Sequence, residues 1–188
     1  MPLQLTSFPL LVPRDGRVSF HDGFADNRHG MAHDAIDLSA PQGTLVLSAA
    51  DGVVLQSWMS GHGPVVGAGW SPRGGNIVTI LDRQGYVHYY AHLMDSPSVR
   101  PGQSFRAGGV LGRVGNTGSV AHGGPMHLHY QVWSTGAGRD AERASGVFTR
   151  RFGPSVNPYP ELVRLARGLG AQVQGSGHVA LGLAASER

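Results

Sequence analysis

Short apolar runs follow one another along most of the chain, from about residue 18 to residue 130. Each run is rich in β-branched or aromatic residues and stops at a turn signal after 4 to 8 residues, a pattern typical of β-strands. The clearest runs are TLVLSA, GVVLQSW, NIVTIL and YVHYYAHL. The dipeptides Asp51-Gly52 and Gln84-Gly85 predict antiparallel hairpins between neighbouring strands. The pattern therefore predicts a mostly β, mainly antiparallel domain.

One segment has the periodicity of a helix. Residues 161–169 (ELVRLARGL) begin after Pro160 and end before Gly170, which are typical helix boundaries. The chain of 188 residues is long enough for one domain with a hydrophobic core, and we expect a single domain whose core lies in residues 18–163. The Ala- and Gly-rich residues 164–188 are expected to form the end of the helix and a peripheral tail.

Residues 61–75 (GHGPVVGAGWSPRGG) form a long Gly-rich interruption between the strand-like runs. They have little strand character, so a long loop is expected, and loops of this length often carry function. Trp58 and Trp70 lie near its ends. The loop is therefore expected either to wall a groove for an extended peptide or to be a variable excursion without contact to a substrate.

Composition narrows the classes of function. Hydrophobic residues make up 40% of the chain and charged residues 14%, as in globular proteins. The formal charge of +3 comes from scattered basic residues without a dense patch, so nucleic-acid binding is not expected. No apolar run approaches the roughly 20 residues of a membrane span, and the N-terminus lacks the basic start of a signal peptide. Because cysteine is absent, a metal site must use His, Asp or Glu ligands.

Ten histidines are the main chemical feature of the sequence. His127 and His129 alternate in MHLHYQVW, so a strand would place both on one face with Cβ atoms roughly 6 to 7 Å apart. Leu128 and Tyr130 would then face the opposite side, where Leu128 suits a core. Two imidazoles at that separation can converge on one metal ion, and the pattern leaves open which of them is a ligand. The alternative is a strand whose polar face holds two histidines without a shared role.

His33 and Asp37 form a second candidate pair, in the segment HDAID. A fully extended strand would place them about 13 Å apart, whereas zinc needs donor atoms within about 2.0–2.2 Å of the ion. The chain must therefore bend between them if both are ligands, with Ile36 anchoring the segment in the core. The alternative is a surface histidine followed by an aspartate in a turn.

A third candidate, His92, lies at the end of the strand-like run YVHYYAHL. His88, Tyr90 and His92 alternate, so all three are expected to share one face, and the alternative is an exposed polar face without chemistry. Taken together, several histidines and one aspartate come from three separate β segments of a chain without cysteine. This combination matches an open catalytic zinc site, which has three protein ligands and a fourth position for water.

Six segments, in order along the chain, resemble the lysostaphin/LytM-type zinc metallopeptidases: HDAID, APQGTLVLSAADGVV, GGNIVTILDRQGYVHYYAHL, VRPGQSFRAGGVLGRVGNTG, GGPMHLHYQV and VNPYPEL. The resemblance covers roughly residues 24–162, and the ordered combination of HxxxD, AHL, GNTG and HLH is very specific. It implies a sandwich-like antiparallel β-sheet core with long loops around a groove and a short C-terminal helix. The metallopeptidase core would then be residues 18–163.

The resemblance also implies the roles of individual residues. His33, Asp37 and His129 would bind zinc, and His92 and His127 would be active-site histidines that are not ligands. The implied activity is zinc-dependent endopeptidase cleavage of cross-bridge or stem peptides of bacterial peptidoglycan, in the periplasm or outside the cell. No other cofactor is implied. The alternative is a non-catalytic regulator of the same fold that binds the cell wall or a cell-wall amidase.

Two positions depart from the commoner family pattern. Asp34-Ala35 stands where Lys-Gly is commoner, and Gln131 stands where a glutamate often follows the HLH motif. Neither touches an expected zinc ligand, so they bear on substrate preference. The segment 115–118 (GNTG) resembles a phosphate-binding loop only superficially, because no Lys-Ser/Thr pair and no helix follow it, and a turn is expected there.

Overall fold

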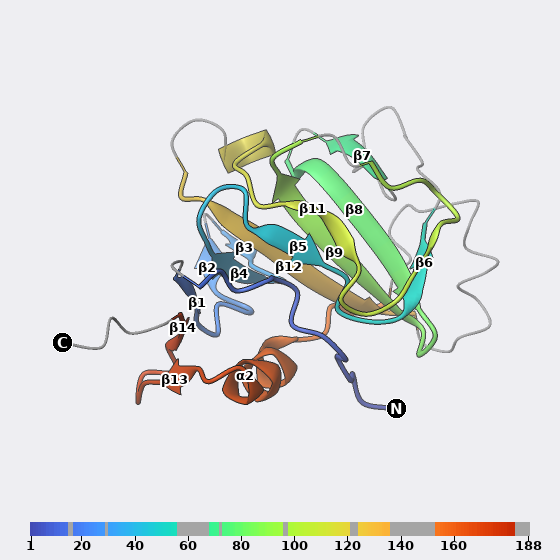
Figure 1. Cartoon of the computed structure of the whole chain (residues 1–188). Coiled ribbons are helices and arrows are strands. Elements are labelled where there is room, and N and C mark those ends of the chain that lie inside the picture. Colours follow the sequence, from blue (N-terminus) through green and yellow to red (C-terminus); the bar gives the residue numbers. More distant parts are fainter. Residues whose placement is uncertain are drawn as a thin grey trace.

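The computed structural model describes residues 1–14, 17–28, 30–55, 68–71, 73–95, 98–120, 124–135 and 153–182 (Figure 1). Strands dominate it. A large antiparallel sheet lies behind a small two-stranded sheet, and one α-helix lies below them in this view. Within these residues, no helix is both long enough and apolar enough to cross a membrane. The predicted mostly β, antiparallel fold is confirmed.

The large sheet has ten strands, and every pairing in it is antiparallel. Their order is β10, β6, β8, β9, β12, β4, β1, β14 and β13, and β7 also pairs with β8. The strands are β1 (Val18–Phe20), β4 (Ile36–Ser39), β6 (Gly52–Val54), β7 (Ala68–Ser71), β8 (Gly75–Asp82), β9 (Tyr86–Leu93), β10 (Ser104–Phe105), β12 (His127–Ser134), β13 (Gln172–Val173) and β14 (Val179–Leu181). The central strands β8, β9 and β12 have eight residues each.

The remaining elements are two small sheets and two short helices. They are β5 (Leu45–Leu47) paired with β11 (Val110–Arg113), β2 (Asn27–Arg28) paired with β3 (Met31–Ala32), the 3-10 helix η1 (Gly118–Val120) and the α-helix α2 (Tyr159–Gly168). In Figure 1, β5 and β11 lie in front of β9 and β12, so the two sheets form the layers of the predicted sandwich.

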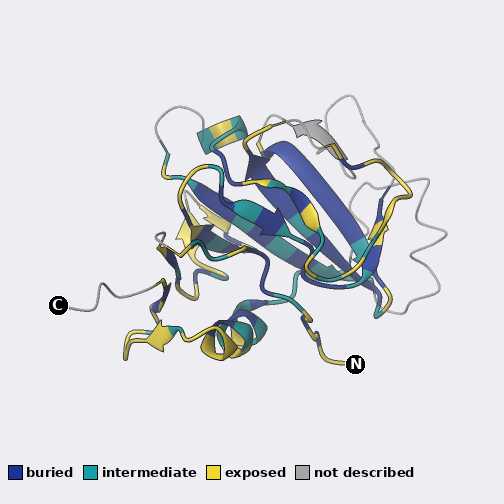
Figure 2. Cartoon of the chain, viewed as in Figure 1, coloured by how far each residue is buried: buried dark blue, intermediate teal, exposed yellow. Residues whose placement is uncertain are grey.

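The main core includes buried side chains from both layers. Val46 and Leu111 of the small sheet are at most 1% exposed, and Val78, Tyr90 and Leu128 of the large sheet are fully buried. Removing this apolar surface from water is the main driving force for the fold. Figure 2 shows the burial running along almost the whole of β8.

The N-terminal segment also belongs to the core, although the core was predicted to begin at residue 18. Leu5, Phe8 and Leu10 are only 2 to 4% exposed. Two side chains of α2 hold this segment by its backbone. The Leu5 N–H donates to Glu161 Oε2 at 2.9 Å, and Arg164 Nη2 donates to the Leu5 carbonyl at 2.6 Å. The core therefore starts earlier than the sequence pattern indicated.

The predicted helix is confirmed, because α2 covers most of residues 161–169 and the chain turns at Gly170, whose φ is +85°. The prediction of a peripheral tail within residues 164–188 is wrong for residues 179–181, and residues 183–188 lie outside the described part of the chain. Strand β14 pairs with β1 in the large sheet, and its Val179 and Leu181 are 0% and 3% exposed. These two side chains alternate toward the core, which is what fixes the short strand there.

The predicted hairpin at Gln84-Gly85 is confirmed, since it joins β8 to β9. Asp82 stabilises the turn, because its Oδ1 accepts hydrogen bonds of 2.8 Å from the N–H groups of both Gln84 and Tyr86. Gly85 has a φ of +84°, a conformation that glycine adopts without steric penalty. The turn thereby fixes the register of the two central strands.

The predicted hairpin at Asp51-Gly52 is wrong. Strand β5 pairs with β11 in the small sheet, whereas β6 pairs with β8 and β10 in the large sheet, so the chain crosses from one layer to the other here. Gly52 is required by close packing, because a Cβ atom would lie 2.4 Å from the Leu81 carbonyl oxygen. The turn-forming dipeptide Asp51-Gly52 therefore lies where the chain passes from the small sheet to the large sheet.

The segment predicted as a long loop over residues 61–75 contains part of a strand, because β7 pairs with β8 from Ala68 to Ser71. Most of the rest lies outside the described residues, as do Trp58 and the side chain of Trp70. The groove wall assigned to this segment stays a prediction.

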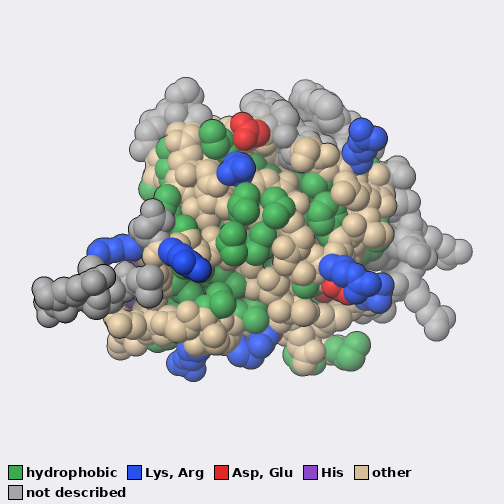
Figure 3. Space-filling view, in the orientation of Figure 1, with side chains coloured by type: hydrophobic (Ala, Val, Ile, Leu, Met, Phe, Trp, Pro, Cys, Tyr) green, Lys and Arg blue, Asp and Glu red, His purple; other side chains and the backbone are tan. Residues whose placement is uncertain are grey.

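Figure 3 shows the face of the molecule formed by the small sheet. Hydrophobic side chains gather near its centre. In the small sheet, Val110 of β11 is 51% exposed. The Lys/Arg side chains visible on this face stand apart from one another around that area. The basic residues on this face are therefore scattered, as the sequence indicated.

Candidate metal centre

The pairing of β4 with β12 brings two parts of the site together. The strands are antiparallel, and Asp37 lies directly opposite His129 in their register. Leu128 and Tyr130 are fully buried in the core, so the alternation of the strand directs His127 and His129 to the opposite face. The side-chain pattern predicted for the HLH motif is confirmed.

His33 reaches the same place because the chain bends before β4. Strand β3 ends at Ala32, a bend follows at Ala35, and Ile36 is fully buried at the start of β4. His33 Nε2 consequently lies 3.4 Å from Asp37 Oδ1, although an extended chain would keep the two residues about 13 Å apart. The predicted bend and the anchoring role of Ile36 are both confirmed.

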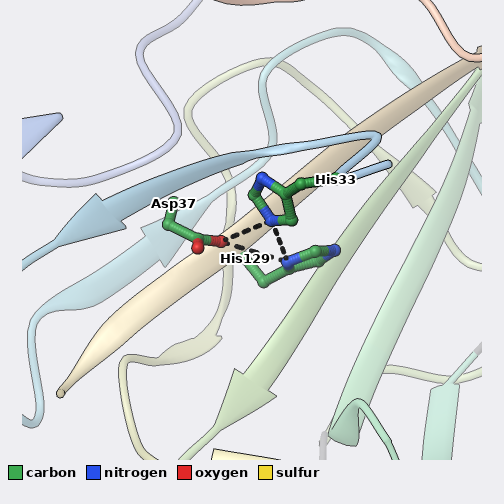
Figure 4. A group of neighbouring side chains, drawn as sticks. All are labelled: His33, Asp37 and His129. Carbon is green, nitrogen blue, oxygen red and sulfur yellow. Dashed lines mark hydrogen bonds and ion pairs between the residues drawn. The ribbon is translucent and has the colours of Figure 1, made fainter. Parts of the chain in front are cut away.

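Three donor atoms converge at this point (Figure 4). Asp37 Oδ1 is 3.1 Å from His129 Nδ1 and 3.4 Å from His33 Nε2, and the two nitrogen atoms are 3.4 Å apart. The three potential ligand atoms all lie within 4.8 Å of one another. Two ligands of a tetrahedral zinc ion with bonds of 2.0–2.1 Å lie about 3.3 Å apart. The separations therefore fit a zinc ion.

A backbone carbonyl orients the His33 ring. Nδ1 of His33 lies 3.1 Å from the Gly23 carbonyl oxygen, which can only accept a hydrogen bond. The ring therefore carries its hydrogen on Nδ1, and the lone pair on Nε2 points toward Asp37. Partners of this kind fix the tautomer and the direction of metal-binding imidazoles.

The two other histidines are held in the same way. Nδ1 of His127 donates to the Pro125 carbonyl, and Nδ1 of His92 donates to the Thr117 carbonyl, each at 2.8 Å. The Nε2 atom of His127 lies 3.6 Å from Asp37 Oδ1. The ring centroids of His92 and His127 are 4.9 Å apart. The structure therefore brings all five predicted site residues together, with two imidazoles beside the three donors.

The prediction that His88, Tyr90 and His92 share one face is wrong for His92. His88 and Tyr90 are fully buried on the core side, where His88 contacts the Tyr130 hydroxyl at 2.8 Å and Asp82 Oδ2 at 3.1 Å. His92 has a φ of +62°, which interrupts the alternation of the strand. Its ring therefore turns away from the core face and toward His127.

Thr117 and Gly74, to which the sequence assigned no role at the site, support His92 in this uncommon conformation. Thr117 Oγ1 donates to the Leu93 carbonyl at 2.7 Å and accepts the Asn76 N–H at 3.0 Å. The His92 N–H donates to the Gly74 carbonyl at 2.7 Å. Backbone strain at a functional site persists only where such neighbours over-determine it. The available signal was the GNTG motif, whose Thr117 supplies the carbonyl partner of His92, whereas the turn predicted there is replaced by an irregular segment that leads into η1.

Replacing Gly75 by alanine is expected to disturb this support. A Cβ atom at Gly75 would lie 2.2 Å from Thr117 Oγ1, and Gly75 has a φ of +65°. We expect Gly75→Ala to displace Thr117 and with it His92, and to lower the free energy of unfolding, measured in urea, by about 1 to 3 kcal/mol more than the control does. Gly102→Ala is the control, because Gly102 has a similar φ of +78° and no atom within 4 Å of its Cβ position. Equal free energies of unfolding in the two variants would contradict this support.

The electrostatics of the site favour a cation. Burial raises the pKa of Asp37, but hydrogen bonds from His129 and His33 outweigh burial and hold the pKa well below its usual range. Burial lowers the pKa of His33, but the hydrogen bond that the protonated ring donates to Asp37, the charge of Asp37 and the Gly23 carbonyl together outweigh burial and leave the pKa raised. The carboxylate therefore attracts positive charge to the donor atoms, and a metal ion provides that charge in place of a proton.

The pKa of His92 shifts in the direction opposite to that of His33, because burial and then the neighbouring His129 lower it to about 4. Between pH 6.5, which is the ordinary pKa of histidine, and about pH 4, the folded protein binds fewer protons than the unfolded chain. The folded state therefore loses stability as the pH falls through this range. We expect the unfolding free energy of the metal-free protein to fall more steeply over this range than that of His92→Asn, since asparagine tolerates positive φ and does not titrate. Urea unfolding at about pH 7 and about pH 4.5 measures the difference; parallel losses in both proteins would contradict the lowered pKa.

Arg28 is a further site residue that the sequence did not indicate. Its Nη1 lies 2.6 Å from Asp37 Oδ2, the carboxylate oxygen other than the one nearest the three histidines. Arg28 belongs to the two-residue strand β2, which has no recognisable motif or apolar period. Its contact with the site depends on tertiary structure.

The sequence model of peptidase family M23 matches residues 31–141, which is more than half of the chain and includes all five predicted site residues. The chain belongs to peptidase family M23. The resemblance to lysostaphin/LytM-type enzymes is thereby confirmed.

Characterised relatives of this M23 chain match parts of it. It is similar to the L-Ala--D-Glu endopeptidase of Bacillus subtilis (strain 168), with 31% identity over 165 residues that cover 83% of this chain and 42% of the relative. It is also similar to the peptidoglycan DD-endopeptidase ShyA of Vibrio cholerae, with 34% identity over 113 residues covering 60% and 23%. The cell division protein DipM of Caulobacter vibrioides is 35% identical over 103 residues, covering 55% and 15%. The M23 chain thus spans less than half the length of each.

Solved structures support the fold. A lytM protein from Ruminococcus gnavus has a TM-score of 0.61 and 26% identity, and the match covers 88% of the M23 chain and 61% of that chain. The catalytic domain of lysostaphin from Staphylococcus simulans has a TM-score of 0.53 and 23% identity, covering 77% and 89%. The predicted lysostaphin/LytM type of fold is confirmed.

Proposed function

We propose that this M23 chain is a zinc-dependent endopeptidase that hydrolyses peptide bonds of bacterial peptidoglycan. The observation that carries the proposal is the convergence of His33, Asp37 and His129, whose donor atoms lie 3.1 to 3.4 Å apart. Two relatives bear names that support the substrate class, an L-Ala--D-Glu endopeptidase and a peptidoglycan DD-endopeptidase.

The donor set suits catalytic zinc. Two imidazoles and one carboxylate are common ligands of such sites, which keep a fourth position for water. A structural site closed by thiolates is excluded, because the chain has no cysteine. When bound, zinc supplies Lewis-acid chemistry that polarises the scissile carbonyl group and acidifies the attacking water.

His127 and His92 are placed to move protons during hydrolysis. Each Nδ1 is fixed by a backbone carbonyl, so each neutral ring has its lone pair on Nε2. The lowered pKa of His92, about 4, keeps this ring neutral near pH 7. A neutral Nε2 accepts the proton of the attacking water, and the resulting Nε2–H donates to the oxyanion or to the leaving amine. The ring centroids of His92 and His127 are 4.9 Å apart, so one ring can accept the proton of the water while the other donates to the oxyanion or to the leaving amine.

The proposed substrates are peptides of the wall, either cross-bridges or stem peptides. Such a substrate lies in the periplasm or outside the cell, and we place the activity there. The segments expected to flank the substrate include residues 61–67, which lie outside the described residues. The proposal for the substrate therefore rests on the site and on the relatives.

A non-catalytic regulator of the same fold is the alternative function. A regulator that binds the wall or an amidase needs no ligand set and no proton-transfer groups. Here three donors have separations that fit zinc, and both further histidines are oriented by carbonyl groups. The intact site favours the enzyme.

Incubation of the purified protein with purified muropeptides tests the proposal. We expect peptide fragments with new amino and carboxyl termini, identified by mass spectrometry, and their loss when a zinc chelator is added. Restoration by added zinc is the control for damage caused by the chelator. Unchanged muropeptides at all zinc concentrations, together with binding to wall material, would favour the regulator instead.

A further inference from the structure

The two oxygen atoms of the Asp37 carboxylate have different partners. Its Oδ1 atom lies 3.1 Å from His129 Nδ1 and 3.4 Å from His33 Nε2, on the side of the proposed metal. Its Oδ2 atom lies 2.6 Å from Arg28 Nη1, which is a short charge-assisted contact. One oxygen thus faces the metal donors, and the other is engaged by a guanidinium group.

Arg28 also lies beside Gly23, the residue whose carbonyl orients His33. A Cβ atom on Gly23 would lie 3.4 Å from Arg28 Nη2, so the guanidinium group lies beside Gly23. The Gly23 carbonyl is the partner of His33 Nδ1. Arg28 and His33 also come from one short segment, because the β2–β3 hairpin that contains Arg28 ends one residue before His33. The arginine therefore contacts the surroundings of two proposed ligands.

We propose that Arg28 is a positioning residue that reserves Asp37 Oδ2 and presents Oδ1 alone to the metal. This inference rests on the metal site of the proposed function and does not depend on which peptide is cleaved. A carboxylate can bind a metal through one or two oxygens, and a guanidinium on Oδ2 removes the second. Single-oxygen binding keeps the site four-coordinate, with its fourth position free.

A stabilising surface ion pair is the simpler explanation for the contact. The Arg28 side chain is 42% exposed, and exposed pairs contribute little to stability. The Asp37 side chain, however, is only 20% exposed, and its other oxygen lies among three imidazoles. A cation placed so close to a metal site also repels the metal, so metal affinity by itself does not account for it. Control of the geometry of Asp37 accounts both for the position of this carboxylate among three imidazoles and for the presence of a cation so close to a metal site.

Cobalt(II) titration of metal-free protein tests the proposal, because visible absorption reports coordination number. The variants are Arg28→Met, which removes the charge and the guanidinium group, and Arg28→Lys, which keeps the charge but not the guanidinium group. Arg113→Met is the matched control, since Arg113 is an exposed arginine in the small sheet whose Nη1 lies 3.4 Å from the Gly43 carbonyl oxygen. Thermal unfolding of each metal-free protein verifies that the variants are folded.

We expect Arg28→Met to give a less intense visible spectrum with cobalt, because Asp37 then binds through both oxygens and the coordination number rises. Arg28→Lys should recover part of the intensity, and Arg113→Met should match the wild type. A cobalt spectrum of Arg28→Met equal to that of the wild type would overturn the role of Arg28 while leaving the metal site intact. A wild-type protein that binds neither cobalt nor zinc would overturn the metal site as well.

Discussion

His33→Ala is expected to lose the metal itself. His33 Nε2 is one of three donors, and its ring is oriented by the Gly23 carbonyl. Two remaining ligands bind zinc far more weakly than three, and we expect zinc content to fall from about one ion per chain to less than about a tenth. Hydrolysis of muropeptides should disappear with the metal. Atomic absorption on protein dialysed against a weak chelator measures the loss.

The control for this variant is another histidine substitution. His178→Ala changes an exposed ring of the C-terminal segment, which stacks on His21 at a centroid distance of 5.9 Å. It should retain zinc and activity. Full zinc occupancy in His33→Ala would show that His33 is not a ligand, whatever the effect on hydrolysis.

His127→Ala is expected to separate chemistry from metal binding. Its Nε2 lies 3.6 Å from Asp37 Oδ1, outside the triangle of donors, and its Nδ1 is held by the Pro125 carbonyl. Removing a positioned proton-transfer group lowers turnover by about 10² to 10⁴-fold. We expect a fall in kcat of this size, with zinc content close to that of the wild type.

The comparison of zinc content with kcat distinguishes the roles of the two histidines in the HLH motif. His129→Ala should behave like His33→Ala, because His129 Nδ1 is a donor at 3.1 Å from Asp37 Oδ1. If His127→Ala loses zinc and His129→Ala keeps it, the assignment within the motif is reversed. Equal kcat in His127→Ala and wild type would remove His127 from the chemistry.

The features of the site that follow a local rule were predictable from the sequence. Strand alternation placed His127 and His129 on one face, and the distance limit for shared ligands required the bend between His33 and Asp37. Buried Ile36 and Leu128 then fix the two segments against the core. Local periodicity and the reach of a metal bond together identified the candidate residues, whereas the choice of His129 over His127 as a ligand came from the resemblance to the family.

The features that depend on a single backbone torsion or on tertiary contacts were not predictable. His92 leaves the face of His88 and Tyr90 because its φ is +62°, which no pattern of residues indicated. Arg28 contacts Asp37 across a short hairpin, and Thr117 supports His92 through hydrogen bonds between distant segments. The sequence contains these residues without showing which partner each will meet.

The arrangement of the strands was predicted only in part for the same reason. The turn signal at Asp51-Gly52 reported a change of direction but not that the chain enters the other layer. Strand β14 has three residues, too few for a clear period, and its place beside β1 is set by burial of Val179 and Leu181. Short strands acquire their position from packing.

A crystal structure of the protein soaked with zinc, with an anomalous difference map at the zinc absorption edge, tests the central claim most directly. We expect one strong peak about 2.0 to 2.2 Å from His33 Nε2, Asp37 Oδ1 and His129 Nδ1, with the Arg28 guanidinium still on Asp37 Oδ2. No peak at that position, or a peak bound by a different set of side chains, would contradict it.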